Sequence, residues 1–89
     1  MYEVLLDGDT LYYPSNRDYM IFDTDLGQDI GLAGDFKFSV PYNNPLYDRI
    51  GQGSIITILR DNNEYWRGEV KEVQVNFDNT KSVYCLEDL

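Results

Sequence analysis

Apolar and polar residues alternate along most of this chain, and this pattern predicts a mainly β fold. The clearest case is residues 35–40, where Phe36, Phe38 and Val40 alternate with polar residues, as in a strand with one buried face. The same pattern predicts strands at residues 2–6, 10–13, 19–22, 35–40, 54–60, 64–77 and 81–87. Residues 26–30 are a weaker candidate for a further short strand.

Two of these predicted strands indicate how the sheet is built. Residues 54–60 carry apolar side chains on both faces, so we expect this strand in the middle of the sheet. Along residues 64–77 the apolar positions change phase near Lys71 and Glu72, from 66, 68 and 70 to 73, 75 and 77. This change predicts a β-bulge or a sharp bend, as found where a sheet curls. We therefore expect a curled sheet or a small β-barrel.

Turn and helix signals separate the strands. Asp7-Gly8 predicts a tight hairpin turn, and Asp-Asn pairs predict turns at residues 61–62 and 78–79. Residues 44–50 are predicted as one short helix, because Asn44 can cap it, Pro45 suits its first position and a glycine follows its last residue.

Length, composition and charge point to one small acidic domain covering residues 1–89. The chain has 89 residues, of which 43% are hydrophobic and 15% aromatic, which suits a folded domain. A core of this size is marginally stable alone, so neighbouring protein is expected to contribute stability. The net charge of −9 makes a surface that repels nucleic acid and anionic lipid.

The residue types needed for most site chemistry are absent from the sequence. There is no histidine, which excludes histidine-based catalysis and histidine metal ligands, and Cys85 has no second cysteine with which to hold zinc. Asp23, Asp25 and Asp29 lack the glycine and glutamate positions of a calcium-binding loop, so we interpret them as a solvated turn. We expect neither enzyme activity nor a cofactor or metal, and no apolar run is long enough to span a membrane.

Five short motifs occur in a fixed order along the chain. They are Ala-Gly-Asp-Phe-Lys-Phe-Ser-Val-Pro at 33–41, Asn-Pro-Leu-Tyr-Asp at 44–48, Ser-Ile-Ile-Thr-Ile at 54–58, Tyr-Trp-Arg-Gly-Glu-Val at 65–70 and Lys-Ser-Val-Tyr-Cys at 81–85. With these motifs the chain resembles the N-terminal segment of siphophage and prophage tail-tip hub proteins, which are described as tail-associated lysins, prophage endopeptidase tail proteins or minor structural proteins. Trp66 stands where that family more often has phenylalanine.

This resemblance implies a structural role in a virion. It implies a curled sheet with a helix against it, similar to the first tube-forming domain of contractile-phage baseplate hubs. Three copies would form a ring that continues the tail tube, docks on the distal tail protein and lets DNA pass without specific binding. The protein would be made in the cytoplasm of a bacterial host and located at the tail tip. The chain would be the first domain, or a fragment, of a longer protein whose later domains carry any peptidoglycan hydrolase activity.

The resemblance also marks individual residues as motif and interface positions. These are Phe36, Phe38, Pro41, Pro45, Tyr47, Trp66, Arg67 and Gly68. Two alternatives stay open at this point. One is a free-standing small β-barrel that binds a peptide or glycan through Tyr12, Tyr13, Tyr42, Tyr47 and Trp66, and the other is a small enzyme or calcium module built on the acidic loop at residues 23–29.

Overall fold

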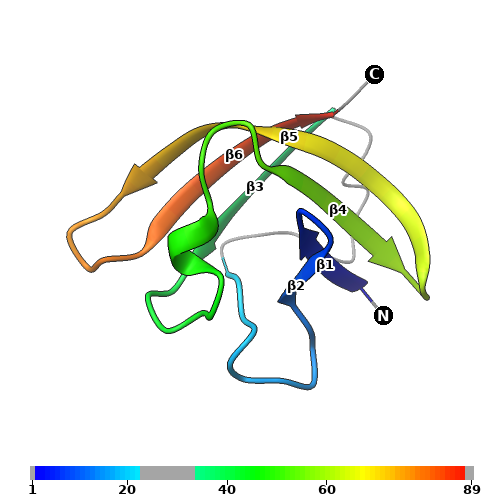
Figure 1. Ribbon diagram of the computed structural model, residues 1–89, viewed down its shortest axis with the longest axis horizontal. Helices are drawn as coiled ribbons and strands as arrows, with labels where there is room; N and C mark the ends of the chain where they lie inside the picture. The colour runs from blue at the N-terminus through cyan, green and yellow to red at the C-terminus, as the bar shows by residue number, and fades with distance from the viewer. Residues whose placement is uncertain (1, 23–33, 88–89) are drawn as a thin grey trace.

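The computed structural model describes residues 2–22 and 34–87 of the chain. Within these residues one antiparallel sheet of six strands arches over a short 3-10 turn and the loop that follows β2 (Figure 1). The elements are β1 (Tyr2–Leu6), β2 (Asp9–Tyr12), β3 (Asp35–Val40), the 3-10 turn η2 (Tyr47–Arg49), β4 (Ile55–Arg60), β5 (Asn63–Val75) and β6 (Lys81–Glu87). The mainly β prediction is therefore confirmed.

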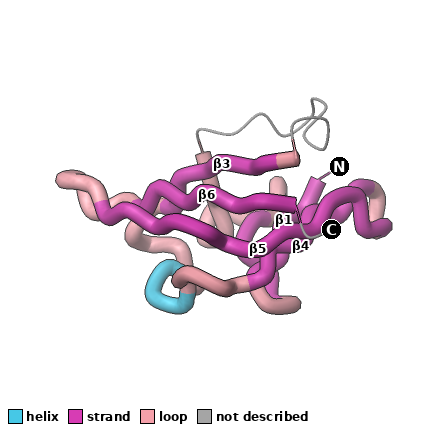
Figure 2. Tube along the Cα trace, turned by 90° about the horizontal axis from the view of Figure 1, so that it is seen from above, coloured by secondary structure: helices cyan, strands magenta, loops and turns pink. Residues whose placement is uncertain are grey.

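The strands lie in the order β2-β1-β4-β5-β6-β3. β4 pairs with β1 on one side and with β5 on the other, which confirms the prediction that this strand is internal. β3 joins the opposite edge by pairing with β6, so that β3, β6 and β5 run side by side (Figure 2). β2 and β3 are the two edge strands and do not pair with each other, so the sheet is a half-barrel.

The hairpin turns follow the predicted turn residues. Asp7 and Gly8 have φ angles of 49° and 90°, and Asp61 and Asn62 have φ angles of 51° and 69°. Positive φ at both central residues is the geometry of the two-residue turns that match the twist of paired strands. Asn79, with φ of 67°, takes the left-handed position in the longer turn between β5 and β6.

β5 is the longest strand and carries the predicted irregularity. Its register with β6 shifts between Val70 and Glu72, which is where the sequence changes phase. The first half of β5 pairs with β4 and the second half with β6, so this bulge lies where the sheet bends from one half to the other.

The core lies on the inner side of the curl. Phe36 packs against Phe38 and against Trp66, with ring centroids 5.2 and 5.9 Å apart. Cys85 is fully buried beside them, as expected for a small core residue. The core is closed by buried side chains from outside the sheet, which are Ile21, Leu46, Tyr47 and Ile50.

The predicted helix at residues 44–50 is wrong, because only the single 3-10 turn η2 forms there. Asn44 is 3% exposed, and its side chain accepts a hydrogen bond from the Leu46 N–H at 2.9 Å, which makes a local turn instead of a helical cap. Its amide nitrogen donates to the carbonyl oxygens of Leu11 and Met20, both at 2.9 Å. These long-range bonds fix the segment in a compact loop, and one turn is too short to propagate a helix.

The predicted strand at residues 19–22 is also wrong. Only Phe22 pairs, through two backbone hydrogen bonds of 2.9 and 2.8 Å with Ser39. The Tyr19 N–H donates instead to the Asn16 carbonyl, within a turn that follows Pro14. The predicted short strand at 26–30 and the acidic loop at 23–29 lie outside the described residues.

Candidate interaction surface

Most of the eight motif residues are buried, so they build the fold. The side chains of Phe36, Phe38, Tyr47 and Trp66 lie in the core. Gly68 is buried as well, whereas Pro41 is partly exposed, and Pro45 and Arg67 are exposed. Any contact that the motif residues make with another protein would therefore be made mainly by Pro45 and Arg67.

Trp66 and Gly68 form the tightest contact of the core. A Cβ atom placed on Gly68 would lie 2.2 Å from Cη2 of Trp66 and 2.4 Å from the carbonyl oxygen of Leu86. The indole ring therefore occupies the space that any other side chain would need. Nε1 of Trp66 is buried and has no hydrogen-bond partner among the described residues.

The tyrosine and tryptophan residues of the peptide- or glycan-binding alternative do not form one surface. Trp66 and Tyr47 are 2% and 7% exposed, so neither ring can stack on a ligand in this conformation. Tyr13 and Tyr42 are exposed, and Tyr42 packs on the edge of the buried Tyr47 ring with centroids 5.2 Å apart. Two of the five proposed contact residues are thus part of the core.

Lys81 is a structural residue that the sequence did not reveal. Its Nζ donates to the Tyr47 carbonyl at 2.6 Å and to the Ile50 carbonyl at 3.4 Å, and lies 4.4 Å from the centroid of the Tyr47 ring. This partly buried ammonium group fastens η2 to the start of β6. Its partners are backbone carbonyls 31 and 34 residues away, so no local pattern could identify them.

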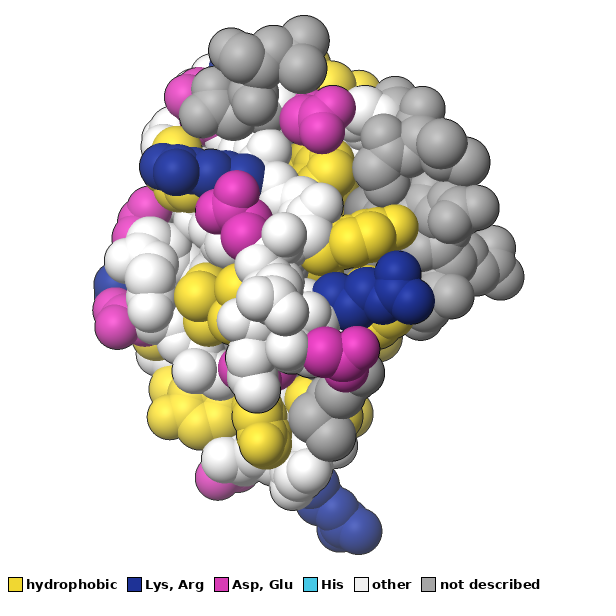
Figure 3. All heavy atoms as spheres, turned by 90° about the vertical axis from the view of Figure 1, so that its right-hand side faces the viewer, with side chains coloured by type: hydrophobic (Ala, Val, Ile, Leu, Met, Phe, Trp, Pro, Cys, Tyr) yellow, Lys and Arg dark blue, Asp and Glu magenta, His cyan; other side chains and the backbone are white. Residues whose placement is uncertain are grey.

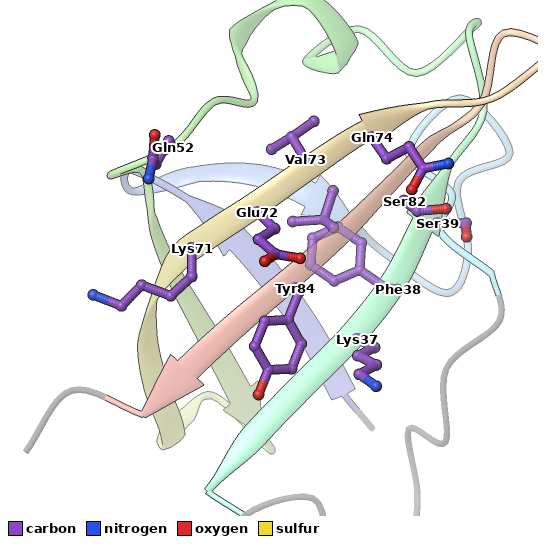
Figure 4. A pocket seen from close by; sticks show the side chains of 11 residues that line it. Lys37, Phe38, Ser39, Gln52, Lys71, Glu72, Val73, Gln74, Ser82 and Tyr84 are labelled. Carbon is purple, nitrogen blue, oxygen red and sulfur yellow. The ribbon is translucent and has the colours of Figure 1, made fainter.

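The outer face of β3, β6 and β5 carries an open polar groove of about 670 Å³ (Figure 4). Strand pairing sets two rows of side chains across it, Glu72–Tyr84–Lys37 and Gln74–Ser82–Ser39. Nζ of Lys37 lies 5.3 Å from the centroid of the Tyr84 ring. Burial raises the pKa of the Tyr84 hydroxyl, and the neighbouring Asp35 carboxylate raises it further. The groove thus offers a neutral phenol, amides and hydroxyls for hydrogen bonding.

A second groove of about 560 Å³ lies at the end of the β5–β6 hairpin and is more apolar. Its lining includes the exposed side chains of Phe22, Val75 and Phe77. Asn76 stabilises the hairpin end by donating through Nδ2 to Thr80 Oγ1 at 3.0 Å and to Ser82 Oγ at 2.9 Å.

The described residues do not assemble a reactive centre. Burial raises the pKa of the Cys85 thiol to about 12, so this group stays protonated and unreactive at neutral pH. Within residues 2–22 and 34–87, no three side chains of the metal-binding types lie close enough together to hold an ion. The same part of the chain has no helix with the length and hydrophobicity needed to cross a membrane.

Charges of both signs are distributed over the surface. On the face in Figure 3, acidic, basic and apolar side chains are interspersed and do not form one extended acidic area. Two ion pairs lie on the surface, Arg49 with Asp9 at 2.7 Å and Lys71 with Glu69 at 3.0 Å. Such exposed pairs contribute about 1 kcal/mol or less to stability.

Comparison of the chain with protein-family models, with curated proteins and with solved structures gave no match. The family resemblance therefore rests on the order of the five sequence motifs.

Proposed function

We propose that this chain is a structural module of a phage or prophage tail-tip hub, in which three copies form a ring that continues the tail tube. The observation that carries the proposal is the open half-barrel. Its two edge strands, β2 and β3, do not close on each other, and exposed sheet edges are normally covered or paired in stable proteins. A ring of copies would cover such edges while retaining the curl of the sheet.

The size and charge of the chain support the same proposal. A domain of 89 residues buries only about 60–65% of the surface of its unfolded chain, so contacts between copies would add needed stability. A net charge of −9 suits a tube through which DNA must pass without adhering, because like charges repel. The same acidity would be of little use to a protein that binds nucleic acid.

In this role the chain needs no catalytic group. The buried motif residues would keep the wall of the ring rigid, and exposed surfaces such as the one around Arg67 would remain for the distal tail protein. Cleavage of peptidoglycan, where a hub protein performs it, would belong to further domains of a longer polypeptide.

An immunoblot of purified particles tests the proposal. An antibody against this domain is used on tailed particles from the phage, or from an induced lysogen, that encodes the sequence. We expect a band that co-sediments with intact particles and migrates well above 10.4 kDa. A protein found only in the particle-free supernatant would contradict the proposal and favour the ligand-binding alternative.

A further inference from the structure

The end of the β5–β6 hairpin exposes more apolar surface than a solitary domain would be expected to leave in water. We call residues 73–80 the hairpin end. Phe77 is fully exposed and Val75 is 59% exposed, although both belong to the same turn-and-strand segment. Single exposed apolar residues are ordinary, but neighbouring ones that line a groove typically mark a contact surface.

The backbone beside these side chains is also available for a contact. β5 is bonded to β4 as far as Glu69, and Val70 exchanges hydrogen bonds with Ser54 and Gly53. From Lys71 to Val75, β5 has a strand partner among the described residues only on the side of β6. A strand edge that also carries exposed apolar side chains favours association with another protein chain.

The shape of the hairpin end pairs a projection with a hollow. Phe77 projects at the turn, and the groove of about 560 Å³ lies along the flank between Phe22 and Val75. Polar groups of Asn76 and Ser82 in this groove are already hydrogen-bonded to each other. An aromatic ring entering the groove would therefore cover apolar surface without stranding these polar atoms.

Charge favours another copy of this chain as the occupant. Two copies with a net charge of −9 repel over most approaches, but the five residues 73–77 carry no charge. The carboxylate of Asp78 is bonded to the hydroxyl and the N–H of Thr80, at 2.7 and 3.1 Å, so it is held within its own turn. Copies can meet at this neutral surface, whereas a basic partner would gain more at the acidic side chains elsewhere.

We infer that Phe77 of one copy inserts into the groove between Phe22 and Val75 of the next copy. This contact joins the tip of one hairpin to the flank of another, so it is heterologous and can close as a ring around a three-fold axis. The inference rests on the proposed function and names the surface through which the ring would form.

Sedimentation velocity on the purified chain tests the contact. We expect wild type to associate with rising concentration, and Phe77→Asp to weaken association at least tenfold, because it places a charge in a desolvated groove. Phe77→Leu should keep most of the association. Tyr13→Asp, the same kind of change at an exposed position away from the hairpin end, should leave it unchanged. Equal association of Phe77→Asp and wild type would overturn the inference, and so would a wild type that stays monomeric.

Disulfide trapping tests the geometry. Chains with Phe77→Cys are mixed with tagged chains carrying Phe22→Cys, and Cys85 is too buried to compete. Cross-links between the two kinds of chain support a tip-to-flank contact, whereas cross-links only between Phe77→Cys chains would mean a tip-to-tip contact and overturn it. The particle immunoblot is independent of both assays. A particle-bound protein whose association ignores Phe77 would overturn this contact while leaving the proposed function standing.

Discussion

Substitution of Gly68 by alanine is the sharpest test of how the core is packed. The added Cβ would lie 2.2 Å from Cη2 and 2.8 Å from Cζ3 of Trp66, and 2.4 Å from the carbonyl oxygen of Leu86. The Trp66 ring is 2% exposed and cannot swing away, and the Leu86 oxygen belongs to the paired strand β6. Either β5 and β6 must separate locally or the indole must move into the Phe36 and Phe38 side chains.

The expected cost follows from this geometry. Overpacking a well-packed core typically costs about 1–3 kcal/mol, and a contact with fixed backbone belongs at the upper end of that range. The total free energy of unfolding of a domain is about 5–15 kcal/mol, so a loss of about 3 kcal/mol is readily measured. With a slope near 1–1.5 kcal/mol per molar urea for a small domain, the unfolding midpoint should fall by about 2–3 M.

Urea unfolding followed by fluorescence measures this directly, because Trp66 is the only tryptophan and is buried. Gly51→Ala is the matched control, since a Cβ there meets nothing within 4 Å and the backbone does not have positive φ. We expect this control to change stability by less than about 1 kcal/mol. If Gly68→Ala unfolds at the same urea concentration as Gly51→Ala, the packing described for Trp66 is incorrect.

Three further substitutions test the loop contacts and the core thiol. Asn44→Ala should destabilise by about 2–5 kcal/mol in urea unfolding, because the carbonyls of Leu11 and Met20 lose their donor, whereas the exposed Asn43→Ala should have almost no effect. Lys81→Met keeps the aliphatic stem but loses the bond to the Tyr47 carbonyl, so amide exchange of Arg49 should accelerate, and unchanged exchange would refute the fastening role. For Cys85, the pKa is about 12 when folded, whereas an exposed thiol in the unfolded chain titrates near 8.5. As the pH rises, the unfolded chain loses this proton first, so the stabilising contribution is complete below about pH 8 and declines above it by up to about 1.4 kcal/mol per pH unit. The stability difference between wild type and Cys85→Ala should therefore shrink between about pH 8 and 11, and a constant difference would contradict the burial of the thiol.

The strands and turns could be predicted from the sequence because their signals are local. Alternation with a period of two located every strand of the sheet, and the Asp-Gly and Asp-Asn pairs located its turns. The phase change near Lys71 located the bulge in β5, because a one-residue insertion reverses which side chains face the core. The apolar character of residues 54–60 on both faces indicated the internal position of β4.

The loops could not be predicted because their structure is set by distant contacts. Asn44 has the sequence context of a helix cap, but its amide reaches 33 residues back to Leu11 and 24 residues back to Met20. The apolar residues at 19–22 suggested a strand, yet Ile21 serves the core from a turn region and only Phe22 pairs. The grooves at the outer face and at the hairpin end depend on how β3 returns to β6, which no local pattern specifies.

Immunogold electron microscopy tests the central claim most directly, because it locates the protein in the assembled particle. An antibody against residues 1–89 would be applied to intact tailed particles and to particles opened at the tail tip. The account predicts gold label confined to the tail end distal to the capsid, and stronger after opening. Absence of label from both preparations, with the protein abundant in the soluble fraction of the same lysate, would contradict a structural role in the tail.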